Sequence, residues 1–161
     1  MAKKRLTPQD RLALEGWNEL VASIRESSDI NPADSTAEIE TRKKRLETDD
    51  EAWFRYYFAQ YDTCEPAIFH KRATKRFMSH DRWYEVRAWS RELAKSARAM
   101  MEIIKLALTR RVRNVLLISN SGDNAQRLLL PFMANMEENQ RIIQDYSPQK
   151  KPGSWETGEF T

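Results

Sequence analysis

A lysine and a serine, Lys95 and Ser96, stand where an extended segment gives way to a helix. Apolar and charged residues alternate over 84–88, which is the period of a strand, and from Ala97 onward apolar residues recur at helical spacing. A lysine in this position can reach the β- and γ-phosphates of a nucleotide, while N–H groups at the helix N-terminus face the phosphates and the serine hydroxyl binds Mg²⁺. The sequence therefore predicts a phosphate-binding loop at residues 90–96.

The spacing departs from the usual phosphate-loop pattern, G-x-x-x-x-G-K-[ST]. Trp89 and Ala94 stand where its two glycines would be. A Lys-Ser pair at a helix start also occurs by chance in proteins that bind no nucleotide. The extended segment before the pair and the amphipathic helix after it, from about Ala94 to Thr109, favour the phosphate site.

A second extended segment is expected after this helix. Residues 114–119 (NVLLIS) are an almost continuous apolar run, which is typical of a strand buried on both faces of a parallel sheet. A strand, a helix and a second strand connected in this way form a βαβ unit. The sequence therefore predicts an α/β fold, with N-terminal helices followed by an incomplete parallel sheet of two visible core strands.

Capping signals mark the helices before this unit. Helices are expected to start at Thr7, Asn31, Thr48 and Pro66, and the second of them is mostly charged. Another helix is expected to follow Ser119, where Pro131 restarts or kinks it. The tail, residues 150–161, is interpreted as a turn entering a strand.

Aromatic residues are concentrated in the helix expected after Thr48, within the sequence EAWFRYYFAQY. Aromatic side chains at this density can stack on nucleic-acid bases. Phe54, Phe58 and Tyr61 are spaced at i, i+4 and i+7, which instead favours one face of a core helix. We favour the core interpretation and keep base stacking as the alternative.

The positive charge of the chain is unevenly distributed. The formal net charge is +3, but residues 66–113 hold 13 basic and 4 acidic side chains, a net charge of +9. Such a block suits a polyanion, either a nucleotide or the DNA backbone, although some of these residues will only cap or solvate helices. The possible nucleic-acid contacts lie on one face of the helix after Pro66: Lys71, Arg72, Lys75 and Arg76.

The loop resembles a known motif. Ser90-Arg91-Glu92-Leu93-Ala94-Lys95-Ser96 is similar to the variant Walker A motif of the tailed-phage terminase large subunits, the motors that package viral DNA. In that family the first glycine is commonly replaced and an arginine lies inside the loop, as Arg91 does here. The loop departs from the family at Ala94, whose methyl group narrows the approach of the backbone to phosphate. The resemblance covers residues 50–161, is strongest over 84–147, and includes LISNSGDNAQRLLLPF.

The resemblance implies a bacteriophage or prophage protein whose cofactors are ATP and Mg²⁺. Ser90 to Ser96 would bind the nucleotide, with Lys95 and Arg91 on the phosphates and Ser96 as the Mg²⁺ ligand. The polar segment from Asn120 to Asp123 would couple nucleotide state to movement. Expected partners are double-stranded phage DNA, the portal, the small terminase subunit and further copies in a ring, all in the host cytoplasm.

The same resemblance divides the chain into three parts. Residues 1–47 are expected to be a helical N-terminal extension, residues 48–83 a helical lead-in, and residues 84–161 a partial P-loop ATPase domain. The family is an ATPase and endonuclease, but no apolar strand ending in an acidic Walker B-type motif follows Ser119, and no nuclease cluster is seen. We therefore expect a truncated chain that is inactive alone, and we assign no catalytic residue in it.

Two other interpretations remain open. The chain could be a helical DNA-binding or phage assembly protein that needs no nucleotide, or a poorly folded prophage remnant. Cysteine-based metal sites and disulfides are excluded because Cys64 is alone, and His70 and His80 are interpreted as ordinary surface or partly buried residues. No apolar run approaches 18 residues, and the start lacks the hydrophobic part of a signal peptide, so we expect a cytoplasmic protein.

Overall fold

The computed structural model describes residues 7–150, 155–156 and 159–160, and they fold mainly into helices. In chain order the helices are α1 (Pro8–Ser27), α2 (Thr36–Glu47), α3 (Asp50–Tyr57), the 3₁₀ turn η1 (Ala59–Tyr61), α4 (Ile68–Ser79), α5 (Lys95–Leu108), α6 (Gly122–Glu138) and α7 (Gln140–Tyr146). Two antiparallel strands of two residues each follow, β1 (Trp155–Glu156) and β2 (Glu159–Phe160). The other residues of the tail for which a turn was predicted, 151–154, 157–158 and 161, lie outside the described residues.

Helix starts follow local capping chemistry, sometimes a few residues from the predicted position. The second helix starts later than Asn31, because Ser35 and Glu38 form a reciprocal capping box there. The third is capped by Asp49, whose carboxylate accepts hydrogen bonds from the N–H groups of Glu51 and Ala52. Pro131 lies inside α6 and does not restart it.

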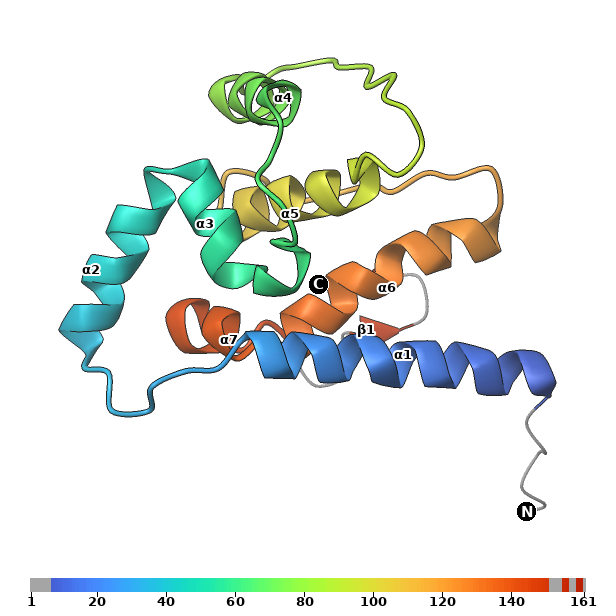
Figure 1. The fold of residues 1–161 in the computed structure, drawn as a ribbon, viewed down its shortest axis with the longest axis horizontal. Helices are drawn as coiled ribbons and strands as arrows, with labels where there is room; N and C mark the ends of the chain where they lie inside the picture. Colours follow the sequence, from blue (N-terminus) through green and yellow to red (C-terminus); the bar gives the residue numbers. More distant parts are fainter. Residues whose placement is uncertain (1–6, 151–154, 157–158, 161) are drawn as a thin grey trace.

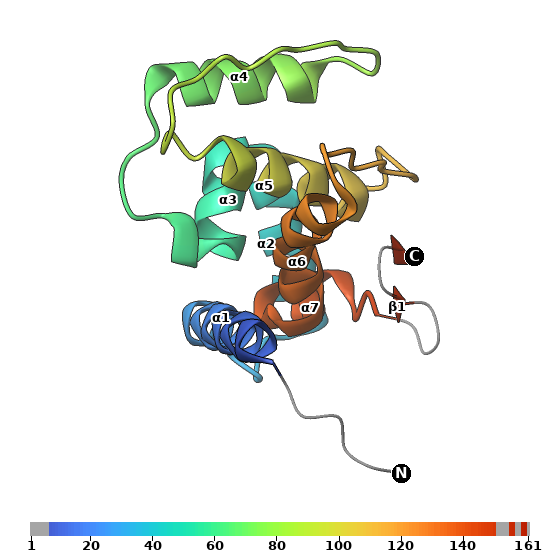
Figure 2. The ribbon, with the colours of Figure 1, turned by 90° about the vertical axis from the view of Figure 1, so that its right-hand side faces the viewer.

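The helices stack on one another in layers. Figures 1 and 2 show α4, α5, α6 and α1 following one another through the molecule, with α2 and α3 on one side. Residues far apart in sequence join the layers: Arg42 of α2 lies 2.5 Å from Asp145 of α7, and the Tyr57 hydroxyl donates to the same carboxylate at 2.6 Å. These contacts hold the N-terminal helices against the C-terminal ones.

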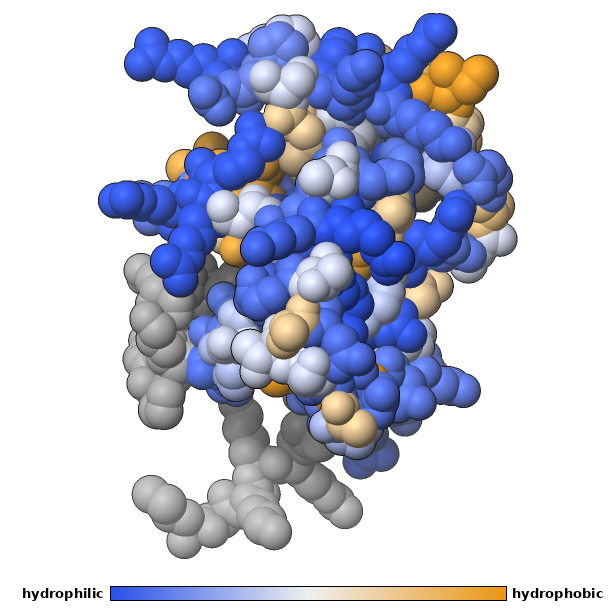
Figure 3. Space-filling model, turned by 90° about the vertical axis from the view of Figure 1, so that its left-hand side faces the viewer, coloured by the Kyte–Doolittle hydropathy of each residue, from blue (hydrophilic) through white to orange (hydrophobic). Residues whose placement is uncertain are grey.

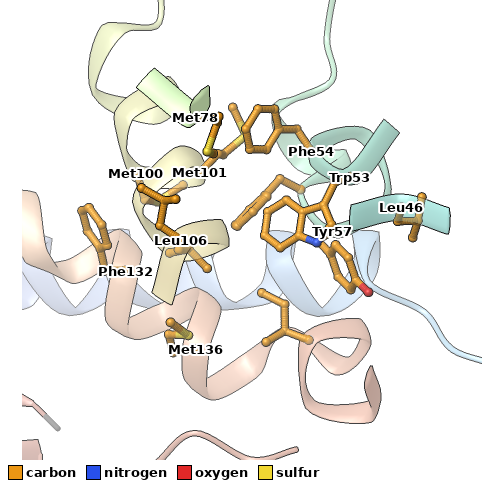
Figure 4. Packing of buried hydrophobic residues seen from close by; sticks show 13 residues of the cluster. Leu46, Trp53, Phe54, Tyr57, Met78, Met100, Met101, Leu106, Phe132 and Met136 are labelled. Carbon is orange, nitrogen blue, oxygen red and sulfur yellow. The ribbon is translucent and has the colours of Figure 1, made fainter. Parts of the chain in front are cut away.

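The hydrophobic core lies where α3, α5 and α6 meet (Figure 4). Trp53 of α3 is completely buried, and its ring packs on Tyr57 with the centroids 4.7 Å apart. Met100 and Ile104 of α5 are also buried, as is Phe132 of α6. Burying each such side chain contributes roughly 1.5–3 kcal/mol relative to leaving it in water. The aromatic helix is therefore a core helix, as favoured from its spacing, rather than a base-stacking surface.

The predicted α/β fold is wrong, because the described residues form a helical structure without a parallel sheet, and their strands are the two short antiparallel ones, β1 and β2. A βαβ unit requires its helix to cover a sheet. Here the apolar face of α5 packs against helices, and three charged residues of the same helix are buried as well: Arg98, Glu102 and Lys105. The apolar face of α5 thus packs on helices, where a βαβ unit would place a sheet.

The first predicted strand is extended but pairs with no other strand among the described residues. Residues 83–89 instead run back along α4, so that Glu85 lies near Arg76 and the Arg87 guanidinium lies over the Phe77 ring. The side chains alternate between two sides, and the apolar ones face solvent. Tyr84 and Val86 are 88% and 73% exposed, while Glu85 and Arg87 are half-buried.

The second predicted strand also lacks a partner. Residues 114–119 form no ladder with any described residue, and Leu116 and Ile118 are 84% and 79% exposed. An apolar run can be buried on both faces only when strands lie on both sides of it and helices cover the sheet. Neither condition is met, so this segment connects α5 to α6 across the surface.

Candidate phosphate-binding loop

The loop between the extended segment and α5 turns back around Lys95. Glu92 and Ala94 both have positive φ values, 66° and 51°, in the left-handed region that glycine adopts without strain. The ammonium group of Lys95, half-buried, donates to the carbonyl of Trp89 and lies 3.4 Å from the carbonyl of Ser90. The lysine predicted to reach phosphate is therefore directed into the loop.

The N-terminus of α5 is free of side-chain caps. Ala94 occupies the cap position and has no side-chain oxygen that could accept hydrogen bonds from the first turn. Ser96 is exposed, and its hydroxyl makes no hydrogen bond within the described residues. The first turn of α5 can thus present N–H donors and a hydroxyl together with the Lys95 charge.

The other predicted loop residues lie around this turn. Ser90, Arg91, Glu92 and Leu93 are exposed, and the loop carries the opposite charges of Arg91 and Glu92. Leu93 accepts a hydrogen bond from the imidazole of His70 on α4, at 3.1 Å from Nε2. No local pattern joins His70 to the loop, because His70 and Leu93 are separated by 23 positions.

The polar segment at residues 120–123 caps the N-terminus of α6. The Ser121 hydroxyl accepts from the N–H of Asn124 and caps this helix, and Asn120 accepts from the Asn124 amide at 2.7 Å. No described hydrogen bond or ion pair joins this segment to the loop at 90–96. The role of residues 120–123 in coupling nucleotide state to movement therefore stays a prediction.

Known proteins give no guide to this site. No protein-family model, no curated protein and no solved structure matches the chain. Among the described residues, no three His, Cys, Asp or Glu side chains gather in a way that could hold a metal ion. The helices that the structure describes include none with the length and apolar character needed to cross a membrane.

The positive charge around the loop is partly neutralised inside the fold. Arg98 pairs with Glu51 of α3, and its guanidinium lies 4.7 Å from the centroid of the Phe54 ring. Lys105 pairs with Asp50 at 2.7 Å. Part of the predicted basic block therefore holds α3 and α5 together and is not presented to a polyanion.

The basic face of α4 is exposed. Helix α4 has four cationic residues and no acidic one. Lys71 pairs with Glu65 at 2.8 Å, and Arg76 lies 3.7 Å from Glu85, while Arg72 and Lys75 form no ion pair within the described residues. Hydrophilic side chains also predominate on the side of the molecule that carries α2, where Figure 3 shows only scattered hydrophobic residues.

Proposed function

We propose that this chain binds the phosphates of ATP at residues 90–96, in the manner of a DNA-packaging ATPase of the tailed-phage terminase kind. The observation that supports the proposal is the conformation of Lys95, whose ammonium group lies against two carbonyl groups of the loop. An ammonium group has three donors, so it can keep loop contacts while binding a phosphate oxygen. The proposal rests on the loop and α5 alone, because the parallel sheet is absent from the described residues.

Each part of the loop has a separate role in this proposal. Lys95 supplies positive charge to the outer phosphates, and the uncapped N–H groups of α5 donate to phosphate oxygens. Ser96, whose hydroxyl makes no hydrogen bond within the described residues, would be the Mg²⁺ ligand beside the phosphates. Arg91 supplies a second cation from within the loop. Mg²⁺ held by Ser96 would neutralise part of the phosphate charge.

Calorimetric titration with ATP and Mg²⁺ tests the proposal. Lys95→Ala is expected to abolish binding, because it removes the positive charge that faces the phosphates. Ala94→Gly is expected to bind more tightly, because a hydrogen atom in place of the methyl group leaves more room for phosphate beside the backbone.

The matched control is Lys44→Ala, an exposed lysine on α2 outside the loop. Circular dichroism establishes that each variant keeps its helices. Unchanged ATP affinity in the Lys95 variant would contradict the proposal.

A second candidate function is binding of duplex DNA by α4. The observation that favours it is the exposed face of this helix, where Arg72 and Lys75 have no acidic partner among the described residues. Each phosphate contact adds about 0.9 to the slope of log affinity against log salt concentration. The double variant Arg72→Ala/Lys75→Ala should therefore lower that slope by about 2 in fluorescence anisotropy titrations with duplex DNA.

The control for the DNA experiment is Lys44→Ala/Arg45→Ala, which removes an exposed Lys-Arg pair of α2. This variant should keep the wild-type slope. An equal loss of slope in both double variants would show that the positive charge acts without a defined surface and would contradict a role for α4.

A further inference from the structure

The first turn of α4 lies against the loop. His70 contributes two hydrogen bonds there: Nδ1 is 3.2 Å from the N–H nitrogen of Ala67, and Nε2 is 3.1 Å from the carbonyl oxygen of Leu93. The N–H of Ala67 can only donate and the carbonyl of Leu93 can only accept. Nδ1 therefore accepts from Ala67, and an N–H at Nε2 is directed to the carbonyl of Leu93 in the loop.

The ring of His70 also packs on the start of the loop. It meets the ring of Trp89 edge to face, with centroids 5.0 Å apart, and Phe69 meets the same indole at 5.1 Å. Trp89 is the residue whose carbonyl accepts from Lys95. His70 thus contacts Trp89, just before the loop, and Leu93, just before the left-handed Ala94.

We propose that His70 is a positioning residue, which anchors the loop at residues 90–96 to α4 and keeps it in the shape that receives phosphate. This inference rests on the proposed phosphate site and adds a residue from outside the loop to it. The hydrogen bond to Leu93 restricts the backbone where the loop leads into α5. The packing on Trp89 restricts the residue whose carbonyl accepts from Lys95. Restricting a loop before its ligand arrives lowers the entropy lost on binding.

Two substitutions separate the hydrogen bond from the packing. His70→Phe keeps a ring against Trp89 but removes both the donor to Leu93 and the acceptor for the N–H of Ala67. His70→Gln keeps a side-chain N–H donor at a similar distance from the backbone. The matched control is His80→Phe, because His80 lies at the other end of α4, stacks on Trp83 at 4.3 Å and makes no described contact with the loop.

The variants are compared by ATP–Mg²⁺ affinity and by the rate of trypsin cleavage after Arg91, located by mass spectrometry. His70→Phe is expected to weaken ATP binding about fivefold, the effect of one hydrogen bond, and to accelerate the cleavage. His70→Gln and His80→Phe are expected to match the wild type in both measurements. Wild-type behaviour of His70→Phe, or a loss in His70→Gln equal to that in His70→Phe, overturns the inference.

Failure of the phosphate site itself gives a different result. If the wild-type chain binds no ATP, the proposed function is wrong and the effect of His70 on affinity falls with it. The cleavage measurement still decides whether His70 anchors the loop: faster cleavage in His70→Phe supports the anchor, and an unchanged rate overturns it.

Discussion

Glu102 is a carboxylate buried in a largely helical surrounding, with only 1% of its surface exposed. It accepts a hydrogen bond from Thr74, and Nη1 of Arg87 lies 2.8 Å from its Oε2 atom. Burial raises the pKa of Glu102, whereas Thr74, Arg87 and the neighbouring Arg98 lower it, and burial has the larger effect. Burial in the fold thus disfavours ionisation of the Glu102 carboxyl group.

The raised pKa predicts how Glu102 changes stability with pH. Over a range that begins near the ordinary glutamate value of about 4.3, the folded state binds more protons at this site than the unfolded state does. The contribution of Glu102 to the free energy of unfolding is therefore present below this range and is lost as the pH rises through it. Urea denaturation measures the free energy of unfolding of the wild type and of Glu102→Gln. The value for the wild type, relative to that of the variant, should fall as the pH rises.

Glu65→Gln provides the opposite case. The hydrogen bond from Lys71 lowers the pKa of Glu65, so its contribution is present above the ordinary glutamate range and is lost as the pH falls. The free energy of unfolding of the wild type, relative to that of Glu65→Gln, should therefore increase as the pH rises. The same trend in both variants would contradict the assignment of the raised pKa to Glu102.

At the scale of elements, helices were better predicted than extended segments. The helix expected from about Ala94 to Thr109 is observed as Lys95–Leu108, because its apolar stripe and its start lie within the helix itself. The run at 114–119 has the composition of a buried strand, but burial of a strand depends on neighbouring strands elsewhere in the chain. No such neighbour lies beside it among the described residues, and its side chains meet solvent.

Two isoleucines test this difference between elements. Ile104 of α5 is 1% exposed, whereas Ile118 in the extended run is 79% exposed. Ile104→Ala should lower the free energy of unfolding by about 2–5 kcal/mol, because it removes buried methyl groups and leaves a cavity. Ile118→Ala, the same substitution on the surface, should change it little. Chemical denaturation measures both values, and an equally large loss at Ile118 would show that the run is buried in solution.

At the scale of the whole molecule, contacts between distant residues determine which charges reach the surface. Residues 66–113 carry most of the positive charge, yet Arg87, Arg98 and Lys105 of this block pair with acidic residues inside the fold. The cations of α4 remain on the surface, where they can meet a polyanion. The charge count predicted a polyanion partner. The fold leaves the exposed cations of α4 as candidates to bind one, because other cations of the block pair with acidic residues.

The sequence by itself determined the helices and the position of the loop. Apolar spacing and capping residues act over a few positions, so α1, α5 and the aromatic core helix α3 could be predicted. Helix α2 starts later than predicted, because Ser35 provides its cap. The Lys95-Ser96 pair marked the start of α5 for the same reason.

Only the tertiary structure decided what each segment packs against. Residues 83–89 are extended, as their alternation indicated, but α4 is their neighbour and their charged side chains face it. The contact of His70 with Leu93 and the burial of Glu102 likewise depend on bringing α4 against the loop and α5. Such contacts join residues more than 20 positions apart, and their free energy depends on the arrangement of whole helices, which no local pattern encodes.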